Sequence, residues 1–404
     1  MVRSKLFSAL KHPSYRRFFS GQAVSILGSW LQQIALSWLV YRTTGSALLL
    51  GVVAFANQAP ILFIAPFSGL LADRFDRRKL LIATQSFAAL QALLLAVLTL
   101  GGWIESWHIV LLALVYGVAM GLDTPVRHSL FVHLLNDRAD LPNAIALNSF
   151  LMNSGRLVGP SIAGVALIFV DEGVCFLLNA LSYLAMLWVA WTLTPPPAKT
   201  QAAITSWLES LKEGFAYAWR TREIRLLLAM VASIGFFGSS YLVLMPVFAK
   251  DVFAGGSETL GFLVGCAGFG AVIGTGYLAA CGDPRQLSRR LACSSFIAGV
   301  ALLGVGLSPS LWIAYPVMVF LGFGIIVTAA SVNILLQSKV DDDKRGRVVS
   351  FYAMAFMGIM PFGSLTAGSL ANQIGAPATA VTFGLCCLTI GTLIGLRIRS
   401  ASAP

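Results

Sequence analysis

The sequence predicts an all-α membrane protein with about twelve transmembrane helices in two six-helix bundles. Composition is the first reason: 57% of the 404 residues are hydrophobic and 11% are charged, whereas about a quarter of a typical soluble protein is charged. The second is that apolar runs long enough to cross a bilayer recur along the whole chain and leave no segment for a soluble catalytic domain. These runs lie near residues 18–41, 46–71, 80–101, 108–130, 144–169, 173–194, 226–249, 258–281, 291–307, 311–336, 348–371 and 377–396.

A short charged turn joins the second and third runs. It reads Gly69-Leu-Leu-Ala-Asp73-Arg74-Phe-Asp76-Arg77-Arg78-Lys79, which is only long enough to connect two neighbouring helices at one membrane surface. The carboxylate of Asp73 could meet the N-terminus of a helix from the other half of the chain, together with the flanking arginines. Two interpretations stay open. The turn is either a latch that breaks when one side of the protein opens, or a set of charges that only fixes the topology.

Positive charge is distributed unevenly between the loops. With the N-terminus inside, the predicted inner segments hold 25 of the 28 Lys and Arg residues, the outer segments hold two, and Arg156 falls within a span. Cytoplasmic loops of membrane proteins carry such an excess. The distribution predicts that both termini are cytoplasmic, and it disfavours a nucleic-acid surface as the reason for the net charge of +11.

The longest segment between the runs lies near the middle of the chain, at residues 195–225. It opens with three prolines, and a Ser-x-x-Glu pattern from Ser206 is typical of a helix start. Large apolar residues then recur every four positions, at Trp207, Leu211, Phe215 and Trp219. They predict either an amphipathic helix on the inner membrane face or a plain linker helix. We therefore predict a first bundle at 1–194, a linker at 195–225 and a second bundle at 226–404.

Two pairs of matching segments indicate an internal duplication. Gly159-Pro-Ser-Ile-Ala-Gly164 matches Gly363-Ser-Leu-Thr-Ala-Gly368 at an offset of 204 residues, and Gly69-Leu-Leu-Ala matches Gly276-Tyr-Leu-Ala at an offset of 207. Two matches in order at nearly the same offset support two six-helix halves, an arrangement built from repeats that many transporters share.

Polar residues in the first run share one helical face. Gln22, Ser25, Ser29, Gln33 and Ser37 are spaced three or four residues apart. Polar side chains are costly in lipid, so this stripe faces either a water-filled cavity or another helix, to which Ser and Gln can form hydrogen bonds.

The fourth and fifth runs contain ionisable residues deep in the membrane. If these runs form a hairpin with its turn near residue 139, Asp123 and Arg156 lie 16 and 17 residues from the turn, and so at similar depth. We predict an Asp123–Arg156 ion pair, shared with Arg127 one helical turn from Asp123. Either Asp123 binds and releases a proton as its surroundings change, or the pair is structural and never titrates.

The sequence contains no pattern typical of an enzyme or a metal site. The six cysteines lie in or at the ends of apolar runs, the four histidines form no ligand pattern, and no nucleophile is paired with a base. We expect no catalytic residue, no metal ligand and no cofactor.

Several motifs resemble those of the major facilitator superfamily, which consists of secondary transporters. The charged turn at 69–79 resembles the superfamily's loop between helices 2 and 3. Gly155-x-x-x-Gly159-Pro160-x-x-Ala163-Gly164 resembles the glycine-proline signature of helix 5 in exporting antiporters. Three further segments resemble the branch with the enterobactin exporter and macrolide-type efflux pumps: Gly21-Gln22 through residues 38–47, Leu141-Pro-Asn143-Ala-Ile-Ala-Leu-Asn148, and Arg345-Gly-Arg347-Val-Val-Ser350.

The resemblance implies roles for individual residues. Gly69, Asp73, Arg74, Arg77 and Arg78 would form the conformational latch, and Gly155, Gly159 and Pro160 would bend and pack helix 5. Helices 1, 4, 7 and 10 would surround a cavity. Its candidate lining residues are Gln22, Ser25, Ser29, Gln33, Asp123, Ser240, Tyr241, Thr328 and Asn333.

The chain also departs from the superfamily's pattern. Asp76 stands where the charged loop usually has a glycine, so a tight glycine turn is not expected there. The helix-4 arginine of many antiporters is missing, since residues 112–121 hold no charge, and helix 1 holds no acid. Within the family's scheme, proton coupling would therefore fall on Asp123, with Arg156 and Arg127 beside it.

The resemblance implies a secondary active transporter of the bacterial inner (plasma) membrane that acts as a monomer. We expect it to export an amphipathic small molecule, either a siderophore or a drug-like compound, by alternating access and in exchange for protons. Its partners would be that substrate, protons and the lipid bilayer, with no nucleic acid. The alternatives are an importer of the same fold and a non-transporting membrane sensor or assembly partner.

Overall fold

Helices dominate the part of the chain that the structure describes. The computed structural model describes residues 7–74, 76–131, 134–135, 137–193, 219–281, 286–340 and 342–401, excluding the side chains at 65–74, 128–129, 131, 138, 342–347 and 398–401. These residues contain no strand, and twelve helices among them are long and apolar enough to cross a membrane. The predicted all-α membrane fold with about twelve spans is confirmed.

The first half of the described chain contains six long helices and two short 3₁₀ turns. They are η2 (Ser8–Lys11), α1 (Pro13–Thr44), α2 (Ala47–Arg74), α3 (Arg77–Leu100), α4 (Ser106–Phe131), η4 (Arg138–Asp140), α5 (Leu141–Phe169) and α6 (Glu172–Thr192). In the second half, π-helical turns interrupt two of the spans. Its elements are α8 (Arg222–Ser233), η5 (Ile234–Gly238), α9 (Tyr241–Val247), η6 (Phe248–Val252), α10 (Ser257–Ala280), α11 (Leu287–Gly306), α12 (Leu311–Lys339), α13 (Asp342–Ala353), η8 (Met354–Gly358), α14 (Met360–Ile374) and α15 (Ala376–Ala401).

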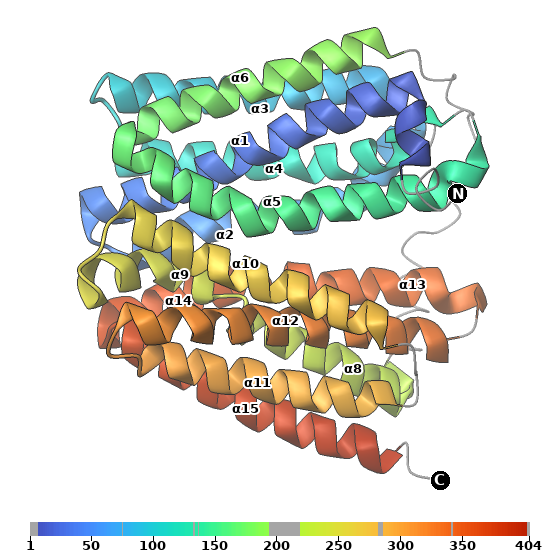
Figure 1. Cartoon of the computed structure of the whole chain (residues 1–404), viewed down its shortest axis with the longest axis vertical. Helices are drawn as coiled ribbons and strands as arrows, with labels where there is room; N and C mark the ends of the chain where they lie inside the picture. Colours follow the sequence, from blue (N-terminus) through green and yellow to red (C-terminus); the bar gives the residue numbers. More distant parts are fainter. Residues whose placement is uncertain are drawn as a thin grey trace. The chain divides into compact units, whose positions relative to one another are not determined.

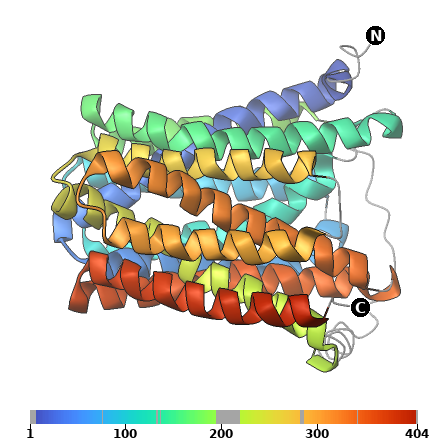
Figure 2. The ribbon, with the colours of Figure 1, turned by 60° about the horizontal axis from the view of Figure 1, so that its bottom comes forward.

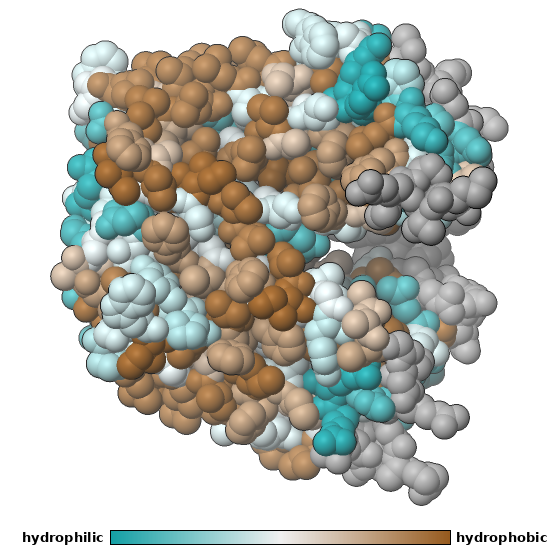
Figure 3. Space-filling model, viewed as in Figure 1, coloured by the Kyte–Doolittle hydropathy of each residue, from teal (hydrophilic) through white to brown (hydrophobic). Residues whose placement is uncertain are grey.

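The chain divides into two compact units, Met1–Thr44 with Ala56–Ala202 and Gly45–Phe55 with Ala203–Pro404. In the first unit α3 packs along α4 and α6, and α1 packs along α5 and α6. In the second, α11 packs along α12 and α15, and α10 along α12. The helices within each unit run side by side in both views (Figure 1, Figure 2). Hydrophobic side chains cover their middle parts and hydrophilic ones gather near their ends (Figure 3), as expected for helices in a bilayer.

The first turns of α2 belong to the second unit because they pack on α14. The rings of Phe55 and Phe362 are 5.5 Å apart between centroids, and a side chain added at Gly51 would meet backbone atoms of Ser364 and Gly368. The predicted division at 1–194, 195–225 and 226–404 lacks this exchange and stays a prediction. Most of its linker, including the helix start predicted at Ser206, lies outside the described residues.

The start of the chain docks onto the start of α5. The backbone N–H of Ala9 donates to Oδ1 of Asn143 over 3.0 Å, and Nε2 of His12 lies 2.8 Å from Oδ2 of Asp140. Hydrogen bonds from Ser8 and His12 lower the pKa of Asp140 from its ordinary value of 3.8, so this carboxylate stays ionised at neutral pH. The contacts anchor the cluster of apolar residues where α1 begins.

Glycines let α10 and α12 approach each other closely. A side-chain carbon added at Gly270 would meet the carbonyl oxygen of Val319, and one added at Gly322 would meet that of Ala267. Small residues at such positions stabilise packed membrane helices because the two backbones come into van der Waals contact.

Replacing Gly270 by alanine should therefore force α10 away from α12. We expect Gly270→Ala to lower the free energy of unfolding by about 1–3 kcal/mol, the usual cost of overpacking. Gly276→Ala on the same helix is the matched control, because nothing lies within 4 Å of the added carbon. Thermal unfolding of both purified variants in detergent measures the difference, and equal stabilities would contradict the close approach.

Candidate functional site

A cavity of about 280 Å³ lies inside the first unit, among α1, α4 and α5. The polar stripe predicted on the first span supplies one wall, since Gln22, Ser25, Ser29 and Gln33 all line the cavity. Further lining residues are Phe18, Ile26, Trp30, Tyr116, Met120, Asp123, Thr124, Arg127, Asn148 and Met152. The wall thus combines hydrogen-bonding groups with large apolar side chains, a mixture suited to an amphipathic ligand.

Asp123 on α4 is the centre of a hydrogen-bond network beside this cavity. Its side chain is 3% exposed and forms an ion pair with Arg127. Its other oxygen accepts hydrogen bonds from the Thr84 hydroxyl over 2.9 Å and from Nε2 of Gln85 over 2.6 Å. Arg127 also reaches the Ser25 hydroxyl on α1, 3.4 Å away. A carboxylate this deeply buried requires such partners, because an unpaired charge within a span is costly.

The predicted Asp123–Arg156 ion pair is wrong. Arg156 is exposed and forms no ion pair with any described acid. The prediction assumed that the fourth and fifth spans pack on each other, but α4 packs along α3 whereas α5 packs along α1 and contacts α6. Similar depth in the membrane therefore does not bring the two side chains together, and among the described side chains Asp123 forms its ion pair with Arg127, the second partner predicted.

Two residues that contact Asp123 were not anticipated from the sequence. Thr84 and Gln85 lie on α3 and are 5% and 0% exposed. The signal was present, because these are polar residues within an otherwise apolar run, as in the stripe on the first span. A polar residue inside a span needs a partner or water, so both positions were legitimate candidates.

A second polar network lies beside the stripe, on the adjacent face of α1. Gln32, next to the stripe, donates to Gln91 on α3 over 3.1 Å and accepts from Asn179 on α6 over 2.8 Å. Gln91 donates in turn to the carbonyl of Leu112 on α4 over 3.2 Å. These three side chains are at most 4% exposed. One face of α1 therefore lines a cavity while the adjacent face is hydrogen-bonded to its neighbours.

The four candidates in the second half of the chain belong to the second unit. Ser240 and Thr328 are fully buried. Ser240 donates to the Phe236 carbonyl, and the Thr328 hydroxyl lies 2.9 Å from that of Ser294. Tyr241 is half-buried, and so is Asn333, which accepts from Gln337 over 3.0 Å. None of the four lines the cavity in the first unit.

The charged turn is described only in part. The side chains of Gly69, Asp73 and Arg74 lie outside the described residues. Asp76 ends the turn as the N-cap of α3, where its side chain accepts from the backbone N–H of Arg78 over 2.8 Å and of Lys79 over 3.3 Å. An aspartate fits at this position, where the resemblance predicts a glycine, because the backbone has a negative φ of −59° and the side chain caps the helix.

The arginines after this cap also contact the rest of the first unit. Nη2 of Arg78 donates to the Trp191 carbonyl at the end of α6 over 2.6 Å, and Arg77 is half-buried. The start of α3 is thereby attached to the end of α6. The latch role of Arg77 and Arg78 stays a prediction.

The glycine-proline signature of the fifth span faces α1. A side-chain carbon added at Gly155 would meet Ile26, and one added at Gly159 would lie 2.5 Å from the Trp30 ring. Pro160 lies buried within α5. The two glycines let Trp30, a cavity-lining residue, pack against the backbone of α5.

Comparisons with known proteins agree with this geometry. A family model described as a transmembrane secretion effector matches residues 4–403. The chain belongs to this family of major facilitator transporters. It is 30% identical to the staphyloferrin A transporter of Staphylococcus aureus over 378 residues, covering 92% of this chain and 93% of that protein. It is 22% identical to macrolide efflux protein A of Streptococcus pyogenes, covering 88% and 89%. These relatives are transporters and not enzymes.

Solved structures show the same fold. The nucleoside transporter NupG superposes with a TM-score of 0.74 at 13% identity, covering 96% of this chain and 98% of that one. A bacterial homologue of the lysosomal transporter Spinster gives 0.73 at 15% identity, covering 96% of both chains. The protein is therefore a multi-pass membrane transporter of the major facilitator fold.

Removing one member of the Asp123–Arg127 pair should destabilise the first unit more than removing both. Arg127→Gln leaves the Asp123 charge without its cation, which costs about 3 kcal/mol for a buried pair. The double variant Asp123→Asn/Arg127→Gln leaves two neutral amides and should recover part of that loss. Thermal unfolding of the two single variants and the double variant gives the coupling energy. Arg156→Gln is the control and should unfold like the unmodified protein.

Proposed function

We propose that this protein is a proton-driven exporter of an amphipathic small molecule, working by alternating access in the bacterial plasma membrane with both termini cytoplasmic. The family, the activities of the relatives and the mixed polar and apolar cavity support this proposal. The excess of Lys and Arg in the predicted inner segments supports the orientation. The substrate is of the siderophore or drug-like kind.

The observation that carries the proposal is that the partners of Asp123 can serve both of its protonation states. The single hydroxyl hydrogen of Thr84 can go to Asp123, 2.9 Å away, or to the Leu81 carbonyl, 3.1 Å away. The Gln85 amide donates to Asp123, while its own carbonyl oxygen is buried and has no partner among the described residues. When Asp123 is protonated, the Thr84 hydroxyl oxygen can accept a hydrogen bond from its O–H, and so can the Gln85 carbonyl oxygen after the amide group turns over.

Protonation of Asp123 would change the charge on the cavity wall. The ionised carboxylate can attract a cationic or hydrogen-bond-donating group of a substrate in the cavity, whereas a neutral carboxyl group attracts such a group less. Protonation would therefore weaken substrate binding, and deprotonation would restore it. Proton and substrate would thus occupy the site alternately, which is the exchange that antiport requires.

Pro125 lies between the two members of this pair and adds to the argument. It lacks a backbone N–H, so α4 lacks the internal hydrogen bond that residue 125 would donate to the carbonyl of Gly121. Local weakening at this point allows the pair to separate without unwinding the rest of the helix.

We further propose that Arg156 attracts an anionic group of the substrate. It lies near the middle of α5, on the side that follows Asn148 and Met152 at four-residue steps, and both of those residues line the cavity. An arginine in mid-span faces water or a partner and not lipid, and Arg156 forms no ion pair with a described acid. A substrate carboxylate is the natural partner.

The remaining predicted roles belong to the same proposal. The turn residues Gly69, Asp73, Arg74, Arg77 and Arg78 would hold one of the two conformations closed. Gly155, Gly159 and Pro160 would allow α5 to move against Trp30, and Ser240, Tyr241, Thr328 and Asn333 would serve the second half. The protein would act as a monomer.

Proton coupling is tested in proteoliposomes of known sidedness under an imposed pH gradient, with staphyloferrin A, a catecholate siderophore, a macrolide and a lipophilic cation as substrates. In a one-for-one exchange, a gradient of about one pH unit supports roughly tenfold accumulation. We expect Asp123→Asn to abolish this accumulation while leaving exchange of labelled for unlabelled substrate intact. Equal accumulation by the variant would assign coupling elsewhere. Accumulation only in the opposite direction would identify an importer.

The role of Arg156 is tested with the substrate found in that assay. We expect Arg156→Gln to raise the KM for an anionic substrate roughly tenfold or more, because one charge-assisted hydrogen bond is lost, whereas Arg156→Lys keeps the charge and most of the affinity. A neutral ester of the same compound is the control, and its KM should not change. If Arg156→Gln affects acid and ester alike, the residue acts on the conformational cycle instead.

A further inference from the structure

A second cavity, of about 520 Å³, lies within the second unit among α10, α11 and α12. This volume falls in the range of about 300–1,000 Å³ typical of ligand pockets. Its lining includes Arg289 and Arg290 from the first turn of α11, Tyr277 from α10, Ser294 one turn further along α11, and Phe323 and Val327 from α12. The transport mechanism proposed above makes no use of it.

The positive charge of this cavity is not balanced by a described acid. Arg290 donates to the Cys281 carbonyl over 2.7 Å and to the Gln286 side chain over 3.4 Å, and its guanidinium lies 5.9 Å from the Tyr277 ring centroid. All three of these partners are neutral. Arg289 is exposed and forms no ion pair with a described acid. The cavity in the first unit differs, because Asp123 balances its arginine.

The segment that begins α11 is positively charged even when its residues outside the described part of the chain are counted. Residues 283–290 contain three arginines and one aspartate, a net charge of +2 even if Asp283 is fully ionised. Asp283 and Arg285 lie outside the described residues. Two guanidinium groups at the start of a helix, where the helix dipole is also positive, form an environment that attracts an anion.

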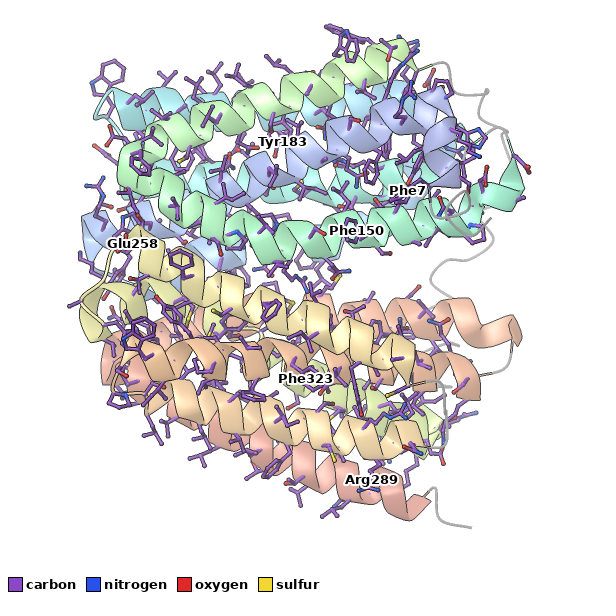
Figure 4. The ribbon with its side chains drawn as sticks, in the orientation of Figure 1. Phe7, Phe150, Tyr183, Glu258, Arg289 and Phe323 are labelled. Carbon is purple, nitrogen blue, oxygen red and sulfur yellow. The ribbon has the colours of Figure 1, made fainter. Side chains whose placement is uncertain are left out.

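The lining changes from charged to apolar along α11. Arg290, Ser294 and Ile297 follow one another at four- and three-residue spacings on one face of the helix. Arg289 lies in the first turn of α11. Phe323 lies further along the bundle, near the middle of α12 (Figure 4). A ligand that fills this cavity therefore needs an anionic group at one end and an apolar portion at the other.

The outer faces of the flanking helices are apolar as well. Exposed side chains near the cavity include Phe269 and Ile273 on α10 and Phe296 and Val300 on α11, each more than 40% exposed. Helix faces of this kind contact the acyl chains of the bilayer. The arginines at the end of the span then stand at the depth of the head groups, on the side where Lys and Arg collect.

We propose that this cavity binds an anionic phospholipid, with Arg289 and Arg290 on the phosphate and Phe323 and Val327 beside its apolar portion. Basic pockets between transmembrane helices bind lipid head groups in this way. Arginine is suited to the role because its planar fork can donate two hydrogen bonds to one phosphate. A free phosphate ion would satisfy the arginines but not the apolar end of the cavity, so the membrane is the source that fits both.

The proposal is tested by native mass spectrometry of the full-length protein in detergent, exchanged into equal amounts of phosphatidylglycerol and phosphatidylcholine. We expect the unmodified protein to retain phosphatidylglycerol preferentially. Arg289→Gln/Arg290→Gln should weaken retention roughly twentyfold, because each basic residue at a membrane surface contributes about fivefold to anionic lipid binding. Arg289→Lys/Arg290→Lys keeps the charge and should retain most of the lipid.

Arg16→Gln/Arg17→Gln is the matched control, since it removes two exposed arginines at the start of α1 and should leave retention within about twofold. Thermal unfolding of each variant shows whether it is folded, and the charge-keeping lysine pair supplies a second comparison if the glutamine pair is not. If all variants retain phosphatidylglycerol equally, whatever the charge at positions 289 and 290, the proposal is overturned. Displacement of the lipid by an excess of inorganic phosphate would show that the cavity is a site for the free ion instead.

Discussion

The buried carboxylate of Asp123 constrains how several helices of the first unit pack together. A carboxylate within a span is stable only while its oxygens are occupied by donors, and these donors come from different helices: Thr84 and Gln85 from α3, and Arg127 from α4, which itself reaches Ser25 on α1. Sliding or rotating one helix against another costs hydrogen bonds. The partners of this one residue therefore connect three helices.

Helix α1 connects the hydrogen-bond network of Asp123 to the cavity, because its side chains contribute to both. Gln32 attaches it to α3 and α6, while Gln22 on the cavity side donates to Asn148 on α5 over 2.9 Å. At the end of α1, Arg42 donates two hydrogen bonds to Glu172, over 2.8 and 3.0 Å. Helix α1 is therefore held to its neighbours by polar contacts at three levels. The close contact between Trp30 and the glycines of α5 adds apolar packing to these bonds.

The sequence alone was sufficient for the spans and for the polar stripe, because both follow from hydrophobic periodicity. It was not sufficient to exclude Arg156 as a partner of Asp123. Residue spacing along a hairpin gives the depth of Arg156 in the membrane, but not which helices pack together, and α5 turns its glycines toward α1. The Asp123–Arg127 contact could be foreseen, since residues four apart are neighbours in any helix. The π-helical turns had no sequence signal that we identified.

The matching segments allow the position of Asp123 to be compared with a position in the second half of the chain. Thr328 stands 205 residues after Asp123, within the offsets of 204 and 207 that relate the matching segments. It meets Ser294 on α11 across 2.9 Å, just as Asp123 on α4 meets Thr84 on α3. Ser294 stands 210 residues after Thr84, outside those offsets, so only Thr328 can be matched by position. The position that corresponds to Asp123 is therefore a hydroxyl group in the second half and a carboxylate paired with an arginine in the first. Hydroxyl groups do not change charge near neutral pH, so a proton can act on the first unit through Asp123, while the corresponding position in the second unit stays neutral throughout.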